Sequence, residues 1–164
     1  MSITHAELAE ASRCWLDDVP YRVALKEIGL PNGKRIDVLA YTRRDSVFRL
    51  VECKASLGDL KRIPKQLELY RRYADMLYVC VSEKLKKEAL VRLPKNVGLL
   101  VVEEQGGSGR RWLSTRAVRN PRTVQMTPAA RTGMKNRLMT WLSVHYQKSR
   151  ICRNCMHEVP HGSS

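Results

Sequence analysis

The sequence has no apolar run long enough to cross a bilayer, no internal repeat and no low-complexity tract. Its N-terminal residues, MSITHAELAEAS, also lack the basic segment and the apolar stretch of a secretory signal. Without such a signal we expect a reducing, cytoplasmic setting. The cysteines are therefore expected to be thiols or metal ligands and not a disulfide framework. They are Cys14, Cys53, Cys80, Cys152 and Cys155.

Acidic residues are scarce, and a long C-terminal stretch has none. The chain has 30 Lys and Arg residues against 16 Asp and Glu residues, a net charge of +14. No acidic residue lies between Glu104 and Glu158, so residues 105–164 carry +10 while residues 1–104 carry +4. Such an excess favours a polyanionic partner. An anionic membrane surface could also attract this charge, but no other feature of the sequence supports membrane binding. We therefore expect nucleic acid as the partner and no membrane.

The order of the predicted elements favours a mixed α/β fold. Three strands joined by short turns predict an antiparallel meander, and two later apolar runs are typical of buried strands. The whole order predicts a mixed sheet flanked by helices. Pro64 marks a kink or the true start of its helix. The expected elements are a helix over 3–16, strands over 21–30, 34–42 and 46–54, a helix over 56–73, a strand over 76–81, a helix over 82–93, and strands over 97–104 and 110–118.

The chain continues past the last predicted strand. A helix start at Thr127-Pro128 predicts a helix that runs to about Tyr146. We therefore expect a main domain over 1–120, a basic, partly helical extension over 121–150 and a flexible tail over 151–164.

The candidate chemistry is carried by Asp37, Glu52 and Lys54. Glu52 and Lys54 are two residues apart on a predicted strand, so they project from the same face. A turn near Arg44 would bring Asp37, on the preceding antiparallel strand, opposite Glu52. Charges among apolar neighbours are costly to bury unless they pair or bind a metal. The alternative is a structural ion-pair cluster, which needs one carboxylate for each lysine. The two carboxylates and one lysine here leave one carboxylate unpaired, as expected for a divalent-cation site.

The residue types in this cluster suit phosphodiester hydrolysis. Carboxylate oxygens are the ligands that Mg²⁺ prefers, and Mg²⁺ takes one or two protein carboxylates beside phosphate oxygens. Lys54 would orient the nucleophile and offset the negative charge that develops on the phosphate.

The segments around these residues resemble the PD-(D/E)xK nuclease superfamily, which has the restriction-endonuclease-like fold. The matching motifs are Asp37 in GKRIDVLAY, Glu52-x-Lys54 in VECKAS, and Gln66-x-x-x-Tyr70 in QLELY. The last motif resembles that of the RecB-like and Cas4-like exonuclease branch. The run from about Lys26 to Val102 also resembles small nucleases of phages and mobile elements and the MmcB-like DNA-repair proteins.

The resemblance implies a role for each matching residue. It implies that Asp37 and Glu52 are metal ligands, together with the backbone carbonyl of Cys53. It further implies that Lys54 is the catalytic lysine and that Gln66 approaches the active site from the helix.

Many members of the superfamily carry an additional carboxylate. We favour Glu27 as a further metal ligand, because its strand is expected to pair with the strand of the first aspartate. Glu7 and Glu10 on the first helix are alternatives, although a solvated helix face explains both. His5 stands in no arrangement that indicates catalysis.

Basic residues outside the cluster are candidates for phosphate contacts. They are Lys34, Arg35, Arg110, Arg111, Arg116, Arg119, Arg122, Arg131, Lys135 and Arg137. A solvated surface is the alternative, but the lack of compensating acids favours nucleic-acid contact. Trp141 could stack on a base, but its helical spacing from Leu138 and Leu142 favours the core.

Cys152-x-x-Cys155 has the thiolate spacing of some Zn²⁺ sites, and His157 and His161 follow it. Ligands packed into so short a segment make a cramped site, so we favour a tail with free thiols over a structural zinc.

Together these features predict an Mg²⁺- or Mn²⁺-dependent deoxyribonuclease that acts in DNA repair, recombination or the processing of phage and mobile-element DNA. The alternative is a non-catalytic DNA-binding accessory protein that retains the nuclease fold. The sequence leaves open RNA as a substrate and endo- against exonucleolytic cutting. With one site per chain, cutting both strands needs a homodimer or two visits.

Overall fold

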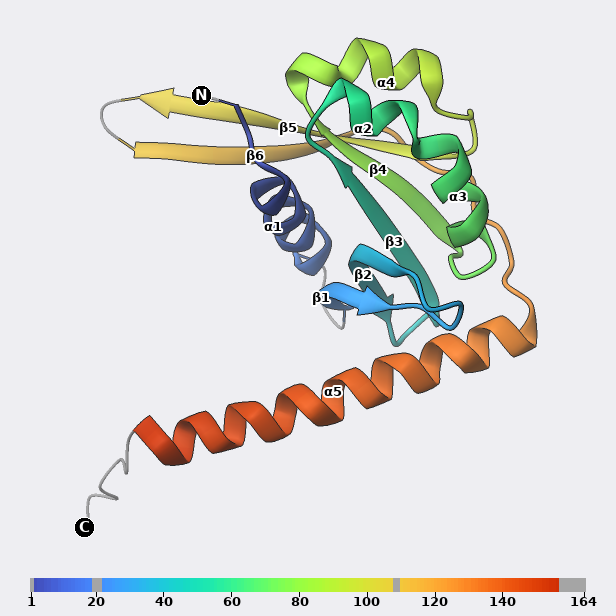
Figure 1. Cartoon of the computed structure of the whole chain (residues 1–164), viewed down its shortest axis with the longest axis vertical. Helices are drawn as coiled ribbons and strands as arrows, with labels where there is room; N and C mark the ends of the chain where they lie inside the picture. Colours follow the sequence, from blue (N-terminus) through green and yellow to red (C-terminus); the bar gives the residue numbers. More distant parts are fainter. Residues whose placement is uncertain (1, 19–21, 108–109, 157–164) are drawn as a thin grey trace.

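The computed structural model describes residues 2–18, 22–107 and 110–156, and over these residues a six-stranded mixed sheet forms the centre of the molecule (Figure 1). The strands are β1 (Arg22–Gly29), β2 (Arg35–Thr42), β3 (Val47–Lys54), β4 (Met76–Ser82), β5 (Gly98–Gly107) and β6 (Arg110–Arg119), and they lie in chain order. The first three strands pair antiparallel, β3, β4 and β5 run parallel, and β6 pairs antiparallel with β5. The predicted meander and mixed sheet are confirmed.

Helices cover both faces of the sheet. On one face, α1 (His5–Asp17) buries Leu8 and Leu16 against a core that includes Val51 and Cys80. The other face carries α2 (Leu57–Lys61), α3 (Ile63–Arg71), the 3₁₀ turn η1 (Glu83–Leu85), α4 (Lys86–Arg92) and α5 (Pro128–Met156). The connections between the parallel strands share a face because β3, β4 and β5 succeed one another in one direction across the sheet.

The central strands are apolar on both faces, which explains their continuous apolar sequence. Along β4, Val79 and Val81 belong to the core under α3 and α4, whereas Tyr78 and Cys80 belong to the core under α1. Burial on both faces is usual for parallel strands covered by helices. The strand that carries Glu52, β3, is therefore paired with a buried strand.

The helix predicted over 56–73 is divided in two. Ser56 caps α2 by accepting a hydrogen bond from the Asp59 N–H, and α2 ends at Lys61. Pro64 then lies in the first turn of α3, where a proline is tolerated because its missing N–H would have no helical partner. The alternative in which Pro64 marks a second helix start is therefore correct.

The C-terminal helix is longer than the sequence suggests. It begins at Pro128 as predicted but continues to Met156, past the predicted end near Tyr146. No glycine or proline occurs between Gly133 and Pro160, so the sequence contains no helix breaker near Tyr146. Among the described residues, no helix is both long and apolar enough to span a membrane.

Helix α5 packs against the edge of the sheet at β1 and extends away from the other helices (Figure 1). Met134 and Leu138 are buried in the core shared with α3 and α4, and Trp141 and Leu142 pack against that core. The basic helix α5 therefore lies along the edge of the sheet formed by β1, next to β2.

Candidate active site

The antiparallel ladder between β2 and β3 ends at Val38 and Val51, and Asp37 lies just beyond it. The register places Asp37 next to Glu52, as the predicted turn requires. The Oδ2 atom of Asp37 accepts a hydrogen bond from the Cys53 N–H at 2.7 Å. The carboxylate of Asp37 therefore bridges two strands at the point where they separate.

Glu52 and Lys54 form a buried ion pair beside Asp37. The Lys54 Nζ donates to the Glu52 Oε1 at 2.6 Å, and the two residues are only 7% and 4% exposed, respectively. Burial raises the pKa of Glu52, and the negative charge of Asp37 raises it further, while Lys54 lowers it. Glu52 thus pairs with Lys54, whereas Asp37 has no lysine partner among the described residues.

Two side-chain oxygen atoms are buried without a hydrogen-bond partner among the described residues. They are Glu52 Oε2 and Gln66 Oε1. A buried polar atom without a partner typically costs about 1–3 kcal/mol, so each such atom needs an explanation. A divalent cation or its waters beside Glu52 would satisfy the free carboxylate oxygen. Carboxylate oxygens such as those of Glu52 and Asp37 also fit Mg²⁺ or Mn²⁺.

Helix α3 carries the Gln66-x-x-x-Tyr70 motif to the site. The Tyr70 hydroxyl donates to the Arg35 carbonyl at 3.2 Å. Its pKa is raised by burial and by the negative charges of Glu52 and Asp37. Gln66 lies one turn earlier on the helix. Tyr70 therefore packs beside the carboxylates, and its hydroxyl fixes α3 to the start of β2.

The backbone carbonyl of Cys53 lies at the same opening. Backbone N–H and C=O groups of one strand residue point to the same side of the strand, and the Cys53 N–H donates to Asp37. The carbonyl therefore faces the space between β2 and β3, beyond the end of their ladder. The Cys53 thiol is buried against α1 instead, and burial near Cys80 raises its pKa.

His5, at the start of α1, is the site residue that the sequence did not indicate. Its Nε2 lies 3.2 Å from the Asp37 Oδ2. A helix start brought onto a distant strand depends on tertiary packing, which spacing along the chain does not show. The contact of His5 with Asp37 is therefore one that the sequence did not indicate, and it does not by itself make His5 catalytic.

A cavity of about 600 Å³ opens on the α1 side of Asp37. It is lined by His5, Ala6, Ala9, Arg13, Ala24, Leu25, Lys26, Glu27, Asp37 and Trp141, which come from α1, β1, β2 and α5. This cavity gives solvent and ligands access to Asp37.

The structure does not bring Glu27 together with the other carboxylates. The backbone of Glu27 is left-handed, with φ of 57°. Its side chain is 69% exposed, and its Oε2 atom lies 3.9 Å from the Arg35 Nη1. Among the described residues, no three Asp, Glu, His or Cys side chains gather closely enough to hold a metal. Glu10 pairs with Arg13 and Lys26. These pairs agree with the expectation that Glu10 lies on a solvated helix face.

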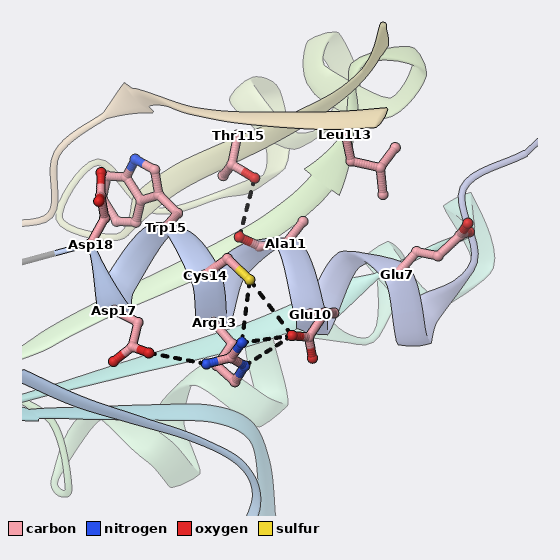
Figure 2. Close-up of a pocket in the computed structure, with 10 residues that line it drawn as sticks. All are labelled: Glu7, Glu10, Ala11, Arg13, Cys14, Trp15, Asp17, Asp18, Leu113 and Thr115. Carbon is pink, nitrogen blue, oxygen red and sulfur yellow. Dashed lines mark hydrogen bonds and ion pairs between the residues drawn. The ribbon is translucent and has the colours of Figure 1, made fainter. Parts of the chain in front are cut away.

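Another cavity, with a volume of about 720 Å³, lies between α1 and β6 (Figure 2). Four carboxylates line it: Glu7, Glu10, Asp17 and Asp18. Arg13 is engaged by Glu10 and Asp17, and the Thr115 hydroxyl donates to the Ala11 carbonyl (Figure 2). A lining this acidic repels phosphate, which directs a polyanion toward other surfaces.

The predicted phosphate-contacting residues fall into different groups. Lys34, Arg122, Lys135 and Arg137 are exposed. Arg35, Arg116 and Arg119 have partners: Arg35 approaches Glu27, Arg116 pairs with Glu83 and Glu103, and Arg119 donates to the Val97 and Pro94 carbonyls. The Arg110 and Arg111 side chains lie outside the described part. So does the Cys152–His161 cluster, of which only the backbone of 152 and 155 is described.

Arg131 holds the molecule together instead of facing solvent. Its Nη2 donates to the Asp75 Oδ1 at 2.6 Å and its Nη1 to the Asp75 Oδ2 at 3.2 Å. Asp75 is only 4% exposed and also accepts a hydrogen bond from the Phe48 N–H. The guanidinium of Arg131 therefore fixes α5 to the loop before β4, a structural role that the sequence did not indicate, and its contact with nucleic acid stays a prediction.

The family model that matches this sequence is described as DNA repair protein MmcB-like, and it covers residues 4–146. The chain belongs to the MmcB-like family. The predicted relation to MmcB-like proteins is therefore confirmed, over a longer part of the chain than the motifs alone span. No curated protein matches the sequence.

The fold is shared with a solved structure. The SPO1766 protein from Silicibacter pomeroyi, described as of unknown function, has a TM-score of 0.71 at 20% identity, over 98% of this chain and all of that one. Pyrococcus furiosus SfsA in complex with Ca²⁺ has a TM-score of 0.38 at 12% identity, over 73% of this chain and 62% of that one. The likeness to SPO1766 supports the α/β fold, and the likeness to SfsA is too low to support any conclusion.

Proposed function

We propose that this protein is a metal-dependent nuclease that hydrolyses phosphodiester bonds of DNA during DNA repair. The observation that carries the proposal is the pair of carboxylates at the end of β3, with a buried, unpartnered Gln66 oxygen on α3. Glu52 is buried with one oxygen unpaired, Gln66 has a buried unpaired oxygen, and Asp37 supplies a second carboxylate. A site made only for stability would satisfy these atoms within the protein.

The residues that would hold Mg²⁺ or Mn²⁺ are Asp37, Glu52 and the Cys53 carbonyl, with His5 as a neighbour of Asp37. A divalent cation bound there supplies Lewis acidity toward the phosphate and lowers the pKa of water. The Cys53 N–H holds the Asp37 carboxylate in one orientation, so little reorganisation is needed when substrate arrives.

Lys54 is the positively charged group of the site. Its ammonium is nearly buried, so little water competes with its interaction with a phosphate oxygen. The negative charge that develops during attack on phosphorus would be offset by this ammonium. The buried oxygen of Gln66, on α3, has no protein partner among the described residues and would be free to accept a hydrogen bond from a bound water or substrate.

DNA as the substrate rests on the family description and on charge. The exposed Lys34, Arg122, Lys135 and Arg137 lie on the loop before β2, the loop before α5 and α5 itself. Such side chains hold phosphates in place without reading the base sequence. Cutting of both strands by one site per chain would require a homodimer or two binding events.

A second candidate function is DNA binding without catalysis. The observation in its favour is the direct Lys54–Glu52 ion pair of 2.6 Å, which partly satisfies the site without a metal. A pure binder would show DNA affinity that falls with salt and does not depend on divalent cations.

Isothermal titration calorimetry with Mn²⁺ and Mg²⁺ separates the two candidates. We expect the wild type to bind Mn²⁺, and Asp37→Asn and Glu52→Gln each to weaken that binding at least tenfold, because a ligand oxygen loses its charge. Glu27→Gln is the matched control, since Glu27 is an exposed carboxylate that lines the same cavity. Mn²⁺ affinity that is absent in the wild type, or unchanged in both site variants, would refute the metal site.

A further inference from the structure

The cavity beside Asp37 has an aromatic wall contributed by α5. Trp141 lines it together with His5 and Asp37, although Trp141 is far from both in the sequence. The volume of about 600 Å³ is within the range of small-ligand sites, which run from about 300 to 1,000 Å³. A pocket of this size accepts a nucleotide, not a double helix.

Trp141 occupies the boundary between core and cavity. Leu138 and Met134, about one and two turns earlier on α5, are buried in the core, whereas Trp141 is only partly buried. The core contact therefore leaves part of the indole surface for the cavity. The expectation that Trp141 serves the core is correct for one side of the residue and incomplete for the other.

We propose that Trp141 stacks on the base of an unpaired nucleotide that enters the cavity beside Asp37. This inference rests on the proposed nuclease function and names its substrate: single-stranded DNA, or an unpaired end or flap. Every base has a π-face, so stacking on an aromatic side chain holds single strands without regard to sequence. Bases within a duplex are stacked on one another and reach a protein ring only when extruded.

The charges around the cavity agree with a strand that passes over α5. Arg137 lies one turn before Trp141 on the same side of α5 and is exposed. Lys26, which pairs with Glu10, lines the cavity from β1. A cation beside a stacking ring suits a single-stranded backbone, and Arg137 is placed to supply it.

The test is fluorescence anisotropy with a short labelled oligothymidylate and a labelled hairpin duplex, both in EDTA so that no cleavage occurs. Trp141→Leu keeps an apolar side chain against the core but removes the aromatic face. We expect it to bind the oligothymidylate about tenfold more weakly, with duplex affinity unchanged. Trp141→Phe should recover most of the affinity. The control is Trp112→Leu, because Trp112 is exposed on β6, at the opposite edge of the sheet.

A spectroscopic measurement tests the same contact without removing Trp141. In the double variant Trp15→Phe/Trp112→Phe, Trp141 is the remaining tryptophan, and stacking should quench its emission as oligothymidylate is added. No quenching, wild-type affinity of Trp141→Leu for the oligothymidylate, or an equal loss for both DNAs would overturn the proposal. Because both measurements are made without metal, they can succeed or fail independently of hydrolysis.

Discussion

Replacing Arg131 with methionine should destabilise the fold by about 2–3 kcal/mol, with little effect on how DNA binding depends on salt. The arginine contacts both oxygens of Asp75, at 2.6 Å and 3.2 Å. Asp75 is 4% exposed, whereas the Arg131 side chain is 26% exposed. The substitution therefore leaves a buried carboxylate with the Phe48 N–H and without its guanidinium.

The magnitude follows from the burial of the two partners. Breaking a buried ion pair by removing one partner typically costs about 3–5 kcal/mol. The partial exposure of Arg131 and the remaining hydrogen bond from Phe48 reduce the figure to about 2–3 kcal/mol. Methionine preserves the apolar stem, so the loss reports on the ion pair more than on packing.

Urea unfolding followed by circular dichroism measures this loss, and Arg137→Met is the matched control. Arg137 is exposed on the same helix, so its replacement should change stability by less than about 0.5 kcal/mol. The slope of log affinity for DNA against log salt should fall by about one for Arg137→Met and stay unchanged for Arg131→Met. An Arg131→Met protein as stable as the wild type, with a reduced salt slope, would refute the structural role.

Saturating Mn²⁺ at about a hundred times its dissociation constant should raise stability by about 2.7 kcal/mol, and an unchanged melting temperature in the wild type or an undiminished rise in Asp37→Asn would contradict this. Hydrogen bonding from Arg13 lowers the pKa of Glu10 to about 2 from 4.5, so the stabilising contribution of Glu10 is present above pH 4.5 and is lost as the pH falls toward 2. Since the Glu10 side chain is 45% exposed, Glu10→Gln should cost only about 0.5–1 kcal/mol at neutral pH and progressively less as the pH falls through about 2. A cost that does not change with pH in urea unfolding would disprove the assignment. Gly98→Ala would put a Cβ 2.5 Å from the Tyr78 ring, so overpacking should destabilise the protein by about 1–3 kcal/mol, and thermal melting that matches the wild type would count against the packing described.

Features set by local pattern could be predicted from the sequence. The alternation of side chains along β3 puts Glu52 and Lys54 on one face, and the short turn after β2 fixes Asp37 next to Glu52. Both follow from the period of a strand and the length of a turn, which are local quantities. The break before Pro64 is local for the same reason.

Features set by tertiary packing could not be predicted in this way. His5 reaches Asp37 because α1 packs across the sheet, and nothing in the spacing of the two residues indicates that contact. The acid-free stretch suggests that Arg131 is unpaired, yet its partner Asp75 comes from a distant loop. Composition counts charges along the chain, whereas ion pairs form in space. The cavity that joins Trp141 to Asp37 is hidden from the sequence for the same reason.

Cleavage of DNA is the most direct measurement of the central claim. Purified protein is incubated with single-stranded, linear, nicked and branched DNA in Mg²⁺, Mn²⁺ or EDTA, beside Lys54→Met, which keeps the aliphatic stem but lacks the ammonium. We predict cleavage that requires the metal and falls about 100-fold or more in Lys54→Met, because the charge that offsets the developing negative charge is gone. No cleavage under any condition, or equal cleavage by wild type and Lys54→Met, would contradict a nuclease site built on Asp37, Glu52 and Lys54.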